Sequence, residues 1–148
     1  MPVSVASRVT SLAEELRPVL LRLSRHLRRE SHGTGLSPLD AQLIGAIKHN
    51  PGIGVSELAD IEQMAAPTMS AHVKRLEEAG FIARDPAACT DKRRTSLGVT
   101  RKGDKALDAV RKQRNDWLAA RLSELSEKEQ QSLLAAIAPL SHLAGEKF

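Results

Sequence analysis

The chain has 148 residues, of which 41% are hydrophobic, 27% are charged and 2% are aromatic. This composition is typical of a soluble globular protein with an aliphatic core, and it excludes a disordered chain. It also argues against a single-strand nucleic-acid binder, because such proteins stack bases on aromatic side chains. The sequence has no apolar run of membrane-spanning length, no signal-peptide core and a single cysteine, Cys89. We therefore expect a cytoplasmic protein without a disulfide, a membrane span or a membrane partner.

The net charge of +4 is unevenly distributed along the sequence. Residues 66–105 carry nine Lys or Arg and five Asp or Glu, whereas residues 33–65 carry only one Lys or Arg and four Asp or Glu. A concentrated basic region is what the neutralisation of nucleic-acid phosphates requires. Taken alone, an ordinary solvated surface explains the charges equally well.

Residues 5–30 have apolar side chains at intervals of three and four, which predicts one long amphipathic helix with a kink near Arg17, caused by Pro18. Its apolar stripe is longer than a small neighbouring module would cover, so the stripe predicts a partner chain. A second helix is predicted to begin at Ser37, with Asp40 at the positive end of its dipole. Its inward side chains are expected to be Leu39, Leu43, Ile44 and Ile47.

A third helix is predicted over residues 55–63, with Leu58, Ala59 and Ile61 inward and with Gly54 as a weak N-terminal cap. A fourth helix follows and runs to Ala79, and Gly80 supplies its left-handed C-terminal cap.

The fourth helix separates its residues into two faces when they are projected at about 100° per residue. Apolar side chains share one face, whereas Pro67, Thr68, Ser70, Ala71, Lys74 and Arg75 lie opposite or on a flank. Small residues near the N-terminus allow close approach to base edges, and Lys74 and Arg75 can reach phosphates. A generic solvated helix face is the alternative.

Two short strands are predicted over residues 81–85 and 96–99, and the connection between them carries Asp91, Lys92, Arg93 and Arg94. Three adjacent cations repel one another unless an anion meets them. An arginine at such a tip can enter the minor groove of DNA, and Asp91 is close enough in sequence to brace it. The hairpin therefore predicts DNA contact, with a solvated turn as the alternative.

A fifth helix is predicted from Arg101 to about Ser123, and a capping box, S-x-x-E, opens a sixth helix at Ser126, which Pro139 kinks or ends. We therefore predict a mainly α fold of about six helices with a small β-hairpin. Residues 36–100 would form a winged helix-turn-helix DNA-binding domain, and residues 5–32 and 101–145 would form dimerisation helices.

Three motifs are specific when taken together: VSELA, the helix ending in LEEAGFI, and the D-x-R-R spacing of the wing; RLSRHLRR in the first helix and LGVTRKG before the fifth accompany them. In these stretches the chain resembles the MarR family of bacterial transcription regulators. The resemblance implies a triangular homodimer in which the first, fifth and sixth helices intertwine. It also implies a fourth helix in the major groove and a wing arginine in the minor groove of a pseudo-palindromic operator in double-stranded DNA. By position, the DNA-binding residues would be Pro67, Thr68, Ser70, Ala71, Lys74 and Arg75 in the helix, and Asp91 and Arg93 in the wing beside Lys92 and Arg94.

The sequence departs from the family pattern at the start of the fourth helix. Ala65 and Ala66 stand where the family often has a hydroxyl cap, and Ala71 stands where it often has an arginine. These changes shift the expected readout toward Thr68, Ser70, phosphate contacts and DNA shape.

The leading interpretation is a repressor that a small-molecule effector releases from DNA. A ligand between the dimerisation helices and the DNA module would change the spacing of the two fourth helices, which must match half-sites about 34–36 Å apart. The alternatives are an architectural DNA-binding protein without an effector and a redox-responsive regulator that acts through Cys89. The sequence identifies no effector or ligand site, and it contains no motif of an enzyme or a cofactor site. No metal site is expected, because the histidines are scattered: His26, His32, His49, His72 and His142.

Overall fold

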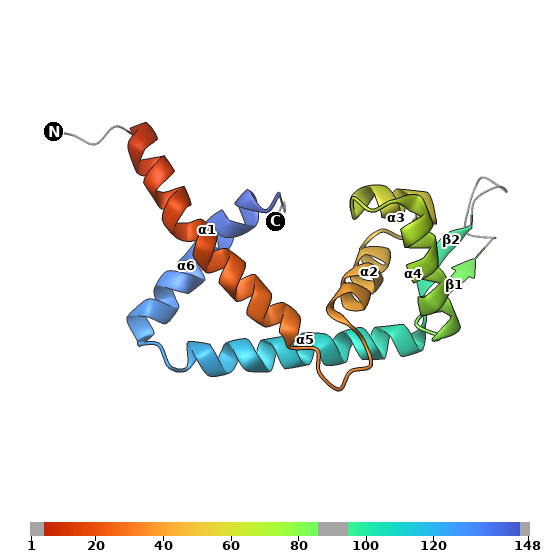
Figure 1. The fold of residues 1–148 in the computed structure, drawn as a ribbon. Coiled ribbons are helices and arrows are strands. Elements are labelled where there is room, and N and C mark those ends of the chain that lie inside the picture. The colour runs from red at the N-terminus through yellow and green to blue at the C-terminus, as the bar shows by residue number, and fades with distance from the viewer. Residues whose placement is uncertain (1–4, 86–94, 146–148) are drawn as a thin grey trace. The chain divides into compact units, whose positions relative to one another are not determined.

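The computed structural model of the protein describes residues 5–85 and 95–145, which form six helices and one two-stranded antiparallel sheet (Figure 1). The chain forms two compact units, which divide within one helix, between Arg114 and Asn115. The predicted fold class, mainly α with a small hairpin, is confirmed. The helices are α1 (Val5–Arg29), α2 (Pro38–His49), α3 (Val55–Ile61), α4 (Ala66–Glu78), α5 (Arg101–Leu122) and α6 (Glu127–Leu143), and the strands are β1 (Ile82–Asp85) and β2 (Ser96–Val99).

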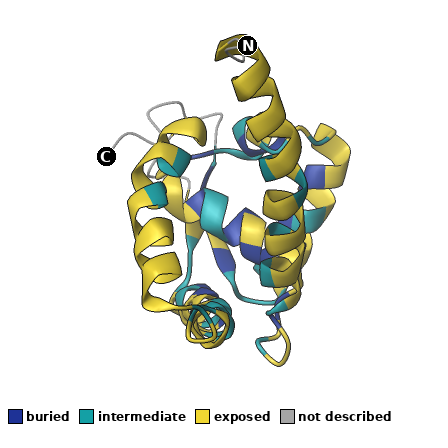
Figure 2. Ribbon diagram, turned by 90° about the vertical axis from the view of Figure 1, so that its left-hand side faces the viewer, coloured by how far each residue is buried: buried dark blue, intermediate teal, exposed yellow. Residues whose placement is uncertain are grey.

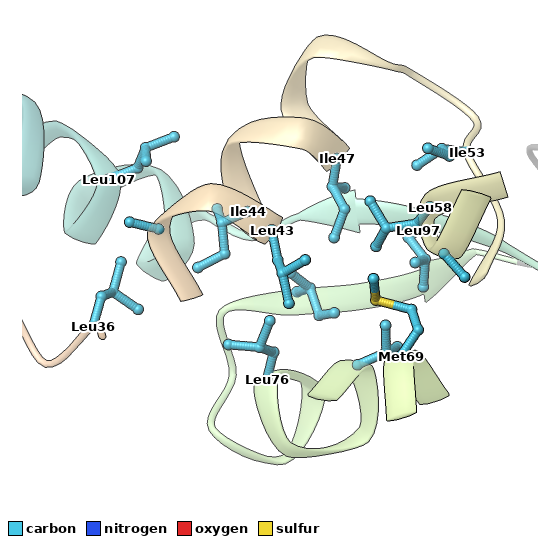
Figure 3. Packing of buried hydrophobic residues seen from close by; sticks show 14 of the residues in the cluster. Leu36, Leu43, Ile44, Ile47, Ile53, Leu58, Met69, Leu76, Leu97 and Leu107 are labelled. Atoms are coloured by element: carbon cyan, nitrogen blue, oxygen red, sulfur yellow. The ribbon is translucent and has the colours of Figure 1, made fainter. Parts of the chain in front are cut away.

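The first unit has one hydrophobic core, which α2, α3, α4, the hairpin and the first three turns of α5 build together (Figure 3). Figure 2 shows that burial is concentrated in this region, whereas α1 is exposed along most of its length. The side chains with the least exposure are aliphatic or methionine, as the composition predicts: Leu43, Ile44, Ile47, Leu58, Met69, Val73, Leu76, Ile82 and Val110.

The start of α2 is a reciprocal capping box. The Ser37 side chain accepts a hydrogen bond from Asp40 N at 3.1 Å, and Ser37 N donates to Asp40 Oδ2 at 3.2 Å. Pro38 occupies the first turn, where its missing N–H would have no partner in the helix. The predicted start of α2 is confirmed, and its inward side chains are buried except Leu39, which is half-buried.

Helix α3 ends two residues earlier than predicted, at Ile61. Gln63 adopts a left-handed conformation with φ 51°, and Met64 N donates to Ala59 O at 2.9 Å. This is the Schellman arrangement, usually built on glycine. Because the helix stops there, Ile61 is 54% exposed, and the prediction that it points inward is wrong. Met64 packs against the core after the turn.

Helix α4 ends as predicted, with Gly80 at φ 81° and Phe81 N donating to Leu76 O at 3.0 Å. The hairpin follows directly and pairs Ile82 with Val99 and Asp85 with Ser96. Leu97 N in β2 donates to Ile53 O at 2.7 Å, which ties the hairpin to the segment before α3.

The two ends of the chain form helices without a buried side chain. Helix α1 continues through Pro18 and has no buried residue. Helix α6 starts at the predicted capping box of Ser126 and Glu129 and also has no buried residue. It continues past Pro139 to Leu143, so the alternative in which Pro139 ends the helix is wrong. Within residues 5–85 and 95–145, no helix has the length and apolar character needed to cross a membrane.

Candidate nucleic-acid interface

Helix α4 presents one polar face to solvent and one apolar face to the core. Met69, Val73 and Leu76 have no exposed surface, so the helix is held firmly on its apolar side. The six side chains predicted to contact DNA from this helix are all exposed: Pro67, Thr68, Ser70, Ala71, Lys74 and Arg75. The structure therefore brings them together on one accessible surface, and their contact with DNA stays a prediction.

The two helices of the helix-turn-helix begin without side-chain caps. Gly54 precedes α3 and Ala65 precedes α4, and neither supplies a side-chain hydrogen bond to its helix. Both positions are in extended backbone conformation, as cap residues normally are. The expected weak cap at Gly54 is confirmed, and α4 relies on its buried face rather than on capping for its stability.

Lys74 and Arg75 are neighbours in sequence but differ in their surroundings. The Lys74 side chain is 74% exposed, and its Nζ lies 3.9 Å from Glu78 Oε1, which is a weak surface pair. Arg75 instead makes a bidentate ion pair with Asp40 of α2, with Nη2 donating to Oδ1 at 2.5 Å and Nη1 donating to Oδ2 at 3.2 Å. On the exposed face of α4, Lys74 is therefore only weakly paired, whereas Arg75 is held in an ion pair with Asp40.

Asp40 is an almost buried carboxylate, with a side-chain exposure of 6%. Burial opposes its ionisation, but hydrogen bonds from Arg75 and Ser37 outweigh burial and lower the pKa of Asp40 below its ordinary value. Sequence reasoning placed Asp40 at the helix start but missed its partner, which is 35 residues away. The S-x-x-D spacing of Ser37 and Asp40 predicts a helix cap, but it gives no indication of the ion pair with Arg75.

The lowered pKa of Asp40 predicts a specific acid sensitivity. The ion pair stabilises the folded chain fully above the ordinary pKa of 3.8, and this contribution is lost as the pH falls through the lower folded-state pKa. The stability difference between the wild type and Asp40→Asn should therefore shrink below about pH 3.8. Urea unfolding at a series of pH values measures the free energy of unfolding of each variant. A wild-type to Asp40→Asn difference that stays constant down to the pH of acid unfolding would contradict a lowered pKa for Asp40.

The wing tip lies outside the described residues, and so do Cys89 and the predicted contacts Asp91, Lys92, Arg93 and Arg94. The base of the hairpin is held to α4, because Arg84 Nε donates to Glu77 Oε2 at 3.0 Å. At the other strand, Ser96 Oγ donates to Asp85 O at 2.9 Å. The wing strands therefore leave from a base that is anchored on α4.

A second junction joins the end of α4 to the start of α5. Thr100 Oγ1 donates to Gly80 O at 2.6 Å and accepts from Gly103 N at 3.1 Å, so Thr100 caps α5, as predicted. Lys102 Nζ donates to Ala79 O at 2.6 Å and lies 4.8 Å from the centroid of the Phe81 ring. Sequence reasoning found the cap but missed Lys102, because the carbonyl it satisfies is 23 residues earlier.

Helix α5 also holds the C-terminal end of α1. Arg114 Nε donates to Leu27 O at 3.0 Å, and Gln113 Nε2 donates to His32 O at 2.7 Å. Burial and the nearby charge of Arg28 lower the pKa of Arg114. Cationic donors at a helix C-terminus satisfy carbonyls that lack partners within the helix. These contacts were not predicted, since the two residues of each contact are more than 80 residues apart in the sequence.

Comparison with known proteins agrees with this arrangement. Residues 34–94, which include α2, α3, α4 and β1, match a family model described as MarR family. A helix-turn-helix transcriptional regulator of Mycobacterium tuberculosis is 29% identical over 125 residues, which are 84% of this chain and 87% of that protein. A solved structure of a Pseudomonas aeruginosa protein assigned as a transcriptional regulator is 31% identical, with a TM-score of 0.78, over 95% of this chain and 98% of that one.

More distant solved structures share the fold. A MepR variant of Staphylococcus aureus bound to an oligodeoxyribonucleotide is 22% identical, with a TM-score of 0.64, over 88% of this chain and 96% of that chain. The matching family and the relatives are regulators of transcription rather than enzymes. The fold, the exposed face of α4 and these comparisons lead to one conclusion: the chain belongs to the MarR family of helix-turn-helix transcriptional regulators.

Proposed function

We propose that the protein is a homodimer that binds a pseudo-palindromic operator in double-stranded DNA and represses transcription until a small molecule releases it. The observation that carries this proposal is the geometry of α4, whose apolar side is completely buried while its polar side is exposed. An exposed helix face with small residues at its N-terminal end fits the major groove, which admits a helix. The DNA-bound MepR variant, which shares the fold, supports the same use of this module.

The proposed contacts divide into base readout and positioning. Thr68 and Ser70 carry hydroxyl groups that can bond base edges, and Pro67 and Ala71 offer small apolar surfaces to thymine methyl groups. Lys74 is placed for a phosphate, since it is largely exposed and only weakly paired. In the wing, Arg93 is assigned to the minor groove and Asp91 to bracing it, with Lys92 and Arg94 beside them.

The proposed dimer would use the helices that lack buried residues. Along α1, Val5, Val9 and Leu12 are between 62% and 71% exposed, and along α6, Leu134 and Leu143 are 69% and 73% exposed. Apolar stripes of this length are unusual on a monomer in water. A second copy of the chain would cover them and would place two α4 helices on successive half-sites.

The effector part of the proposal follows from coupling between sites. A ligand that favours a dimer with the wrong spacing of its α4 helices weakens DNA binding by its differential affinity for the two states, typically ~1–3 kcal/mol. A purely architectural DNA-binding protein would show neither an effector response nor a preferred sequence.

A gel-shift titration distinguishes a sequence-specific repressor from an architectural DNA-binding protein. The protein's own promoter region is compared with scrambled DNA of the same composition at one salt concentration. A repressor should bind the promoter at least ~1000-fold more tightly than scrambled DNA. Equal affinity for both duplexes would remove the proposal of sequence-specific regulation.

Arg93→Ala should weaken operator binding by roughly 1–3 kcal/mol, because an arginine in the minor groove meets the most negative potential of the duplex. The dimer should be unchanged. Lys128→Ala in α6 is the matched control, since it removes one positive charge from an exposed site outside the proposed DNA contacts and on the side of the helix opposite its apolar stripe. Operator titrations measure both variants, and equal losses would show that only net charge matters and would reject the role of Arg93.

A further inference from the structure

The Asp40 carboxylate uses both of its oxygen atoms to join two helices. Oδ2 accepts from Ser37 N and from Arg75 Nη1, both at 3.2 Å, and Oδ1 accepts from Arg75 Nη2 at 2.5 Å. The first turn of α2 and the third turn of the recognition helix are therefore tied through one almost buried charge. A bidentate arginine–carboxylate pair fixes direction as well as distance.

Arg75 is held on more than one side. Its Nη2 also lies 3.4 Å from His72 Nδ1, one turn earlier on α4, while 52% of its side chain remains exposed. If Arg75 moved to a DNA phosphate, the buried Asp40 charge would lose its ion-pair partner and keep only the hydrogen bond from Ser37 N, which is strongly unfavourable. The pair should therefore persist when DNA binds. Lys74, the preceding residue, is held only weakly, because its partner Glu78 is exposed and the Nζ–Oε1 distance is 3.9 Å.

We propose that Asp40 is a positioning residue for DNA recognition, which holds Arg75 so that α4 keeps one orientation on α2, and that Arg75 is not a phosphate contact. This inference rests on the proposed function, because it assumes that the exposed face of α4 meets DNA. The family resemblance makes Arg75 a DNA contact, whereas this inference makes it a structural residue that holds α4 on α2. The matched cation Lys74 keeps the phosphate role.

Orientation and charge have different signatures in DNA binding. Each phosphate contact contributes about 0.9 to the slope of log K against log salt concentration, whatever the sequence. The orientation of a recognition helix instead affects base-edge contacts, which only the preferred sequence offers. Asp40→Asn and Arg75→Met should therefore weaken binding to the preferred duplex by about tenfold, a typical coupling for residues in one network. Neither should change the salt slope.

The test uses the full-length protein and a short duplex that the wild type has selected from a random library, with a scrambled duplex for comparison. Affinity for both is measured by fluorescence anisotropy over a range of salt concentrations. Lys74→Met is the matched control on the adjacent position and should lower the slope by about 0.9 on both duplexes. Asp40→Glu keeps the capping box and the charge, so it should restore most of the affinity that Asp40→Asn loses.

Folding is checked by circular dichroism, and the comparison of Asp40→Glu with Asp40→Asn remains valid if one variant is less stable. The double variant Asp40→Asn, Arg75→Met should bind no more weakly than either single variant, because the two side chains act as one unit. A salt slope that falls in Arg75→Met as it does in Lys74→Met would overturn the inference. So would wild-type affinity of Asp40→Asn for the selected duplex.

The two proposals fail in different ways. If Lys74→Met leaves the slope unchanged and the wild type selects no sequence, the DNA-binding role of the α4 face is wrong. If Lys74→Met behaves as expected and the Asp40 variants bind like the wild type, only the positioning role is wrong.

Discussion

Gly103→Ala is expected to lower the free energy of unfolding by about 3 kcal/mol or more, at the upper end of the effects of overpacking. A Cβ atom at this position would lie 2.1 Å from Phe81 O and 2.8 Å from Val99 Cγ1. The closer atom belongs to the backbone, and it already accepts a hydrogen bond from Thr100 N at 3.0 Å. It therefore cannot move without opening the junction between α4 and α5.

Urea unfolding measures this effect, and Gly45→Ala is its control. Gly45 lies inside α2, and a Cβ there would meet nothing within 4 Å. Alanine should therefore stabilise α2 by up to about 1 kcal/mol, because it restricts the unfolded chain and suits a helix. Opposite signs for the two variants are expected. A Gly103→Ala protein as stable as the wild type would mean that α5 does not approach Phe81 so closely.

Leu12→Asp is expected to convert the proposed dimer to a monomer and to weaken operator binding by roughly a hundredfold to ten-thousandfold, because the second half-site would no longer be bound by the same particle. Leu12 lies in the middle of the apolar stripe of α1 and is 62% exposed in the single chain. A buried, unpaired carboxylate in the dimer would be strongly unfavourable.

The matched control for Leu12 is Ser7→Asp, which adds the same charge to the opposite side of α1. Ser7 is exposed, and on a helix it faces away from the stripe that contains Leu12. Sedimentation equilibrium measures the mass of each variant. A monomeric wild type, or a Leu12→Asp protein that keeps the mass of the wild type, would contradict the use of α1 in dimerisation.

Features with local causes were predicted well from the sequence. The starts of α2 and α6 follow from Ser37 and Ser126, each with an acidic side chain three residues later. The end of α4 follows from Gly80, whose left-handed conformation is typical of glycine. The end of α3 was predicted too late because Gln63 adopts the same conformation without the residue that normally signals it.

Features that depend on distant contacts were not predicted. The pairing of Asp40 with Arg75 and the close approach of Gly103 to Phe81 arise only when α2, α4 and α5 are packed together. Helical periodicity shows that Arg75 is on a polar flank, but it cannot show whether its partner is a phosphate or a carboxylate. The exposed face of α4 could therefore be located from the sequence, whereas the ion pair that distinguishes Arg75 from Lys74 required the structure.

If the proposed dimer forms, the absence of any buried side chain from α1 and α6 in the single chain makes the protein sensitive to dilution. A helix that is stabilised mainly by its partner loses order when the partner leaves, because most helical stability comes from packing. In the proposed dimer, the melting temperature should then rise with protein concentration. At low protein concentration, an operator with two adjacent half-sites would itself raise the local concentration of subunits. DNA would in that case act as a scaffold that promotes subunit pairing, and occupancy would rise more steeply than the first power of protein concentration.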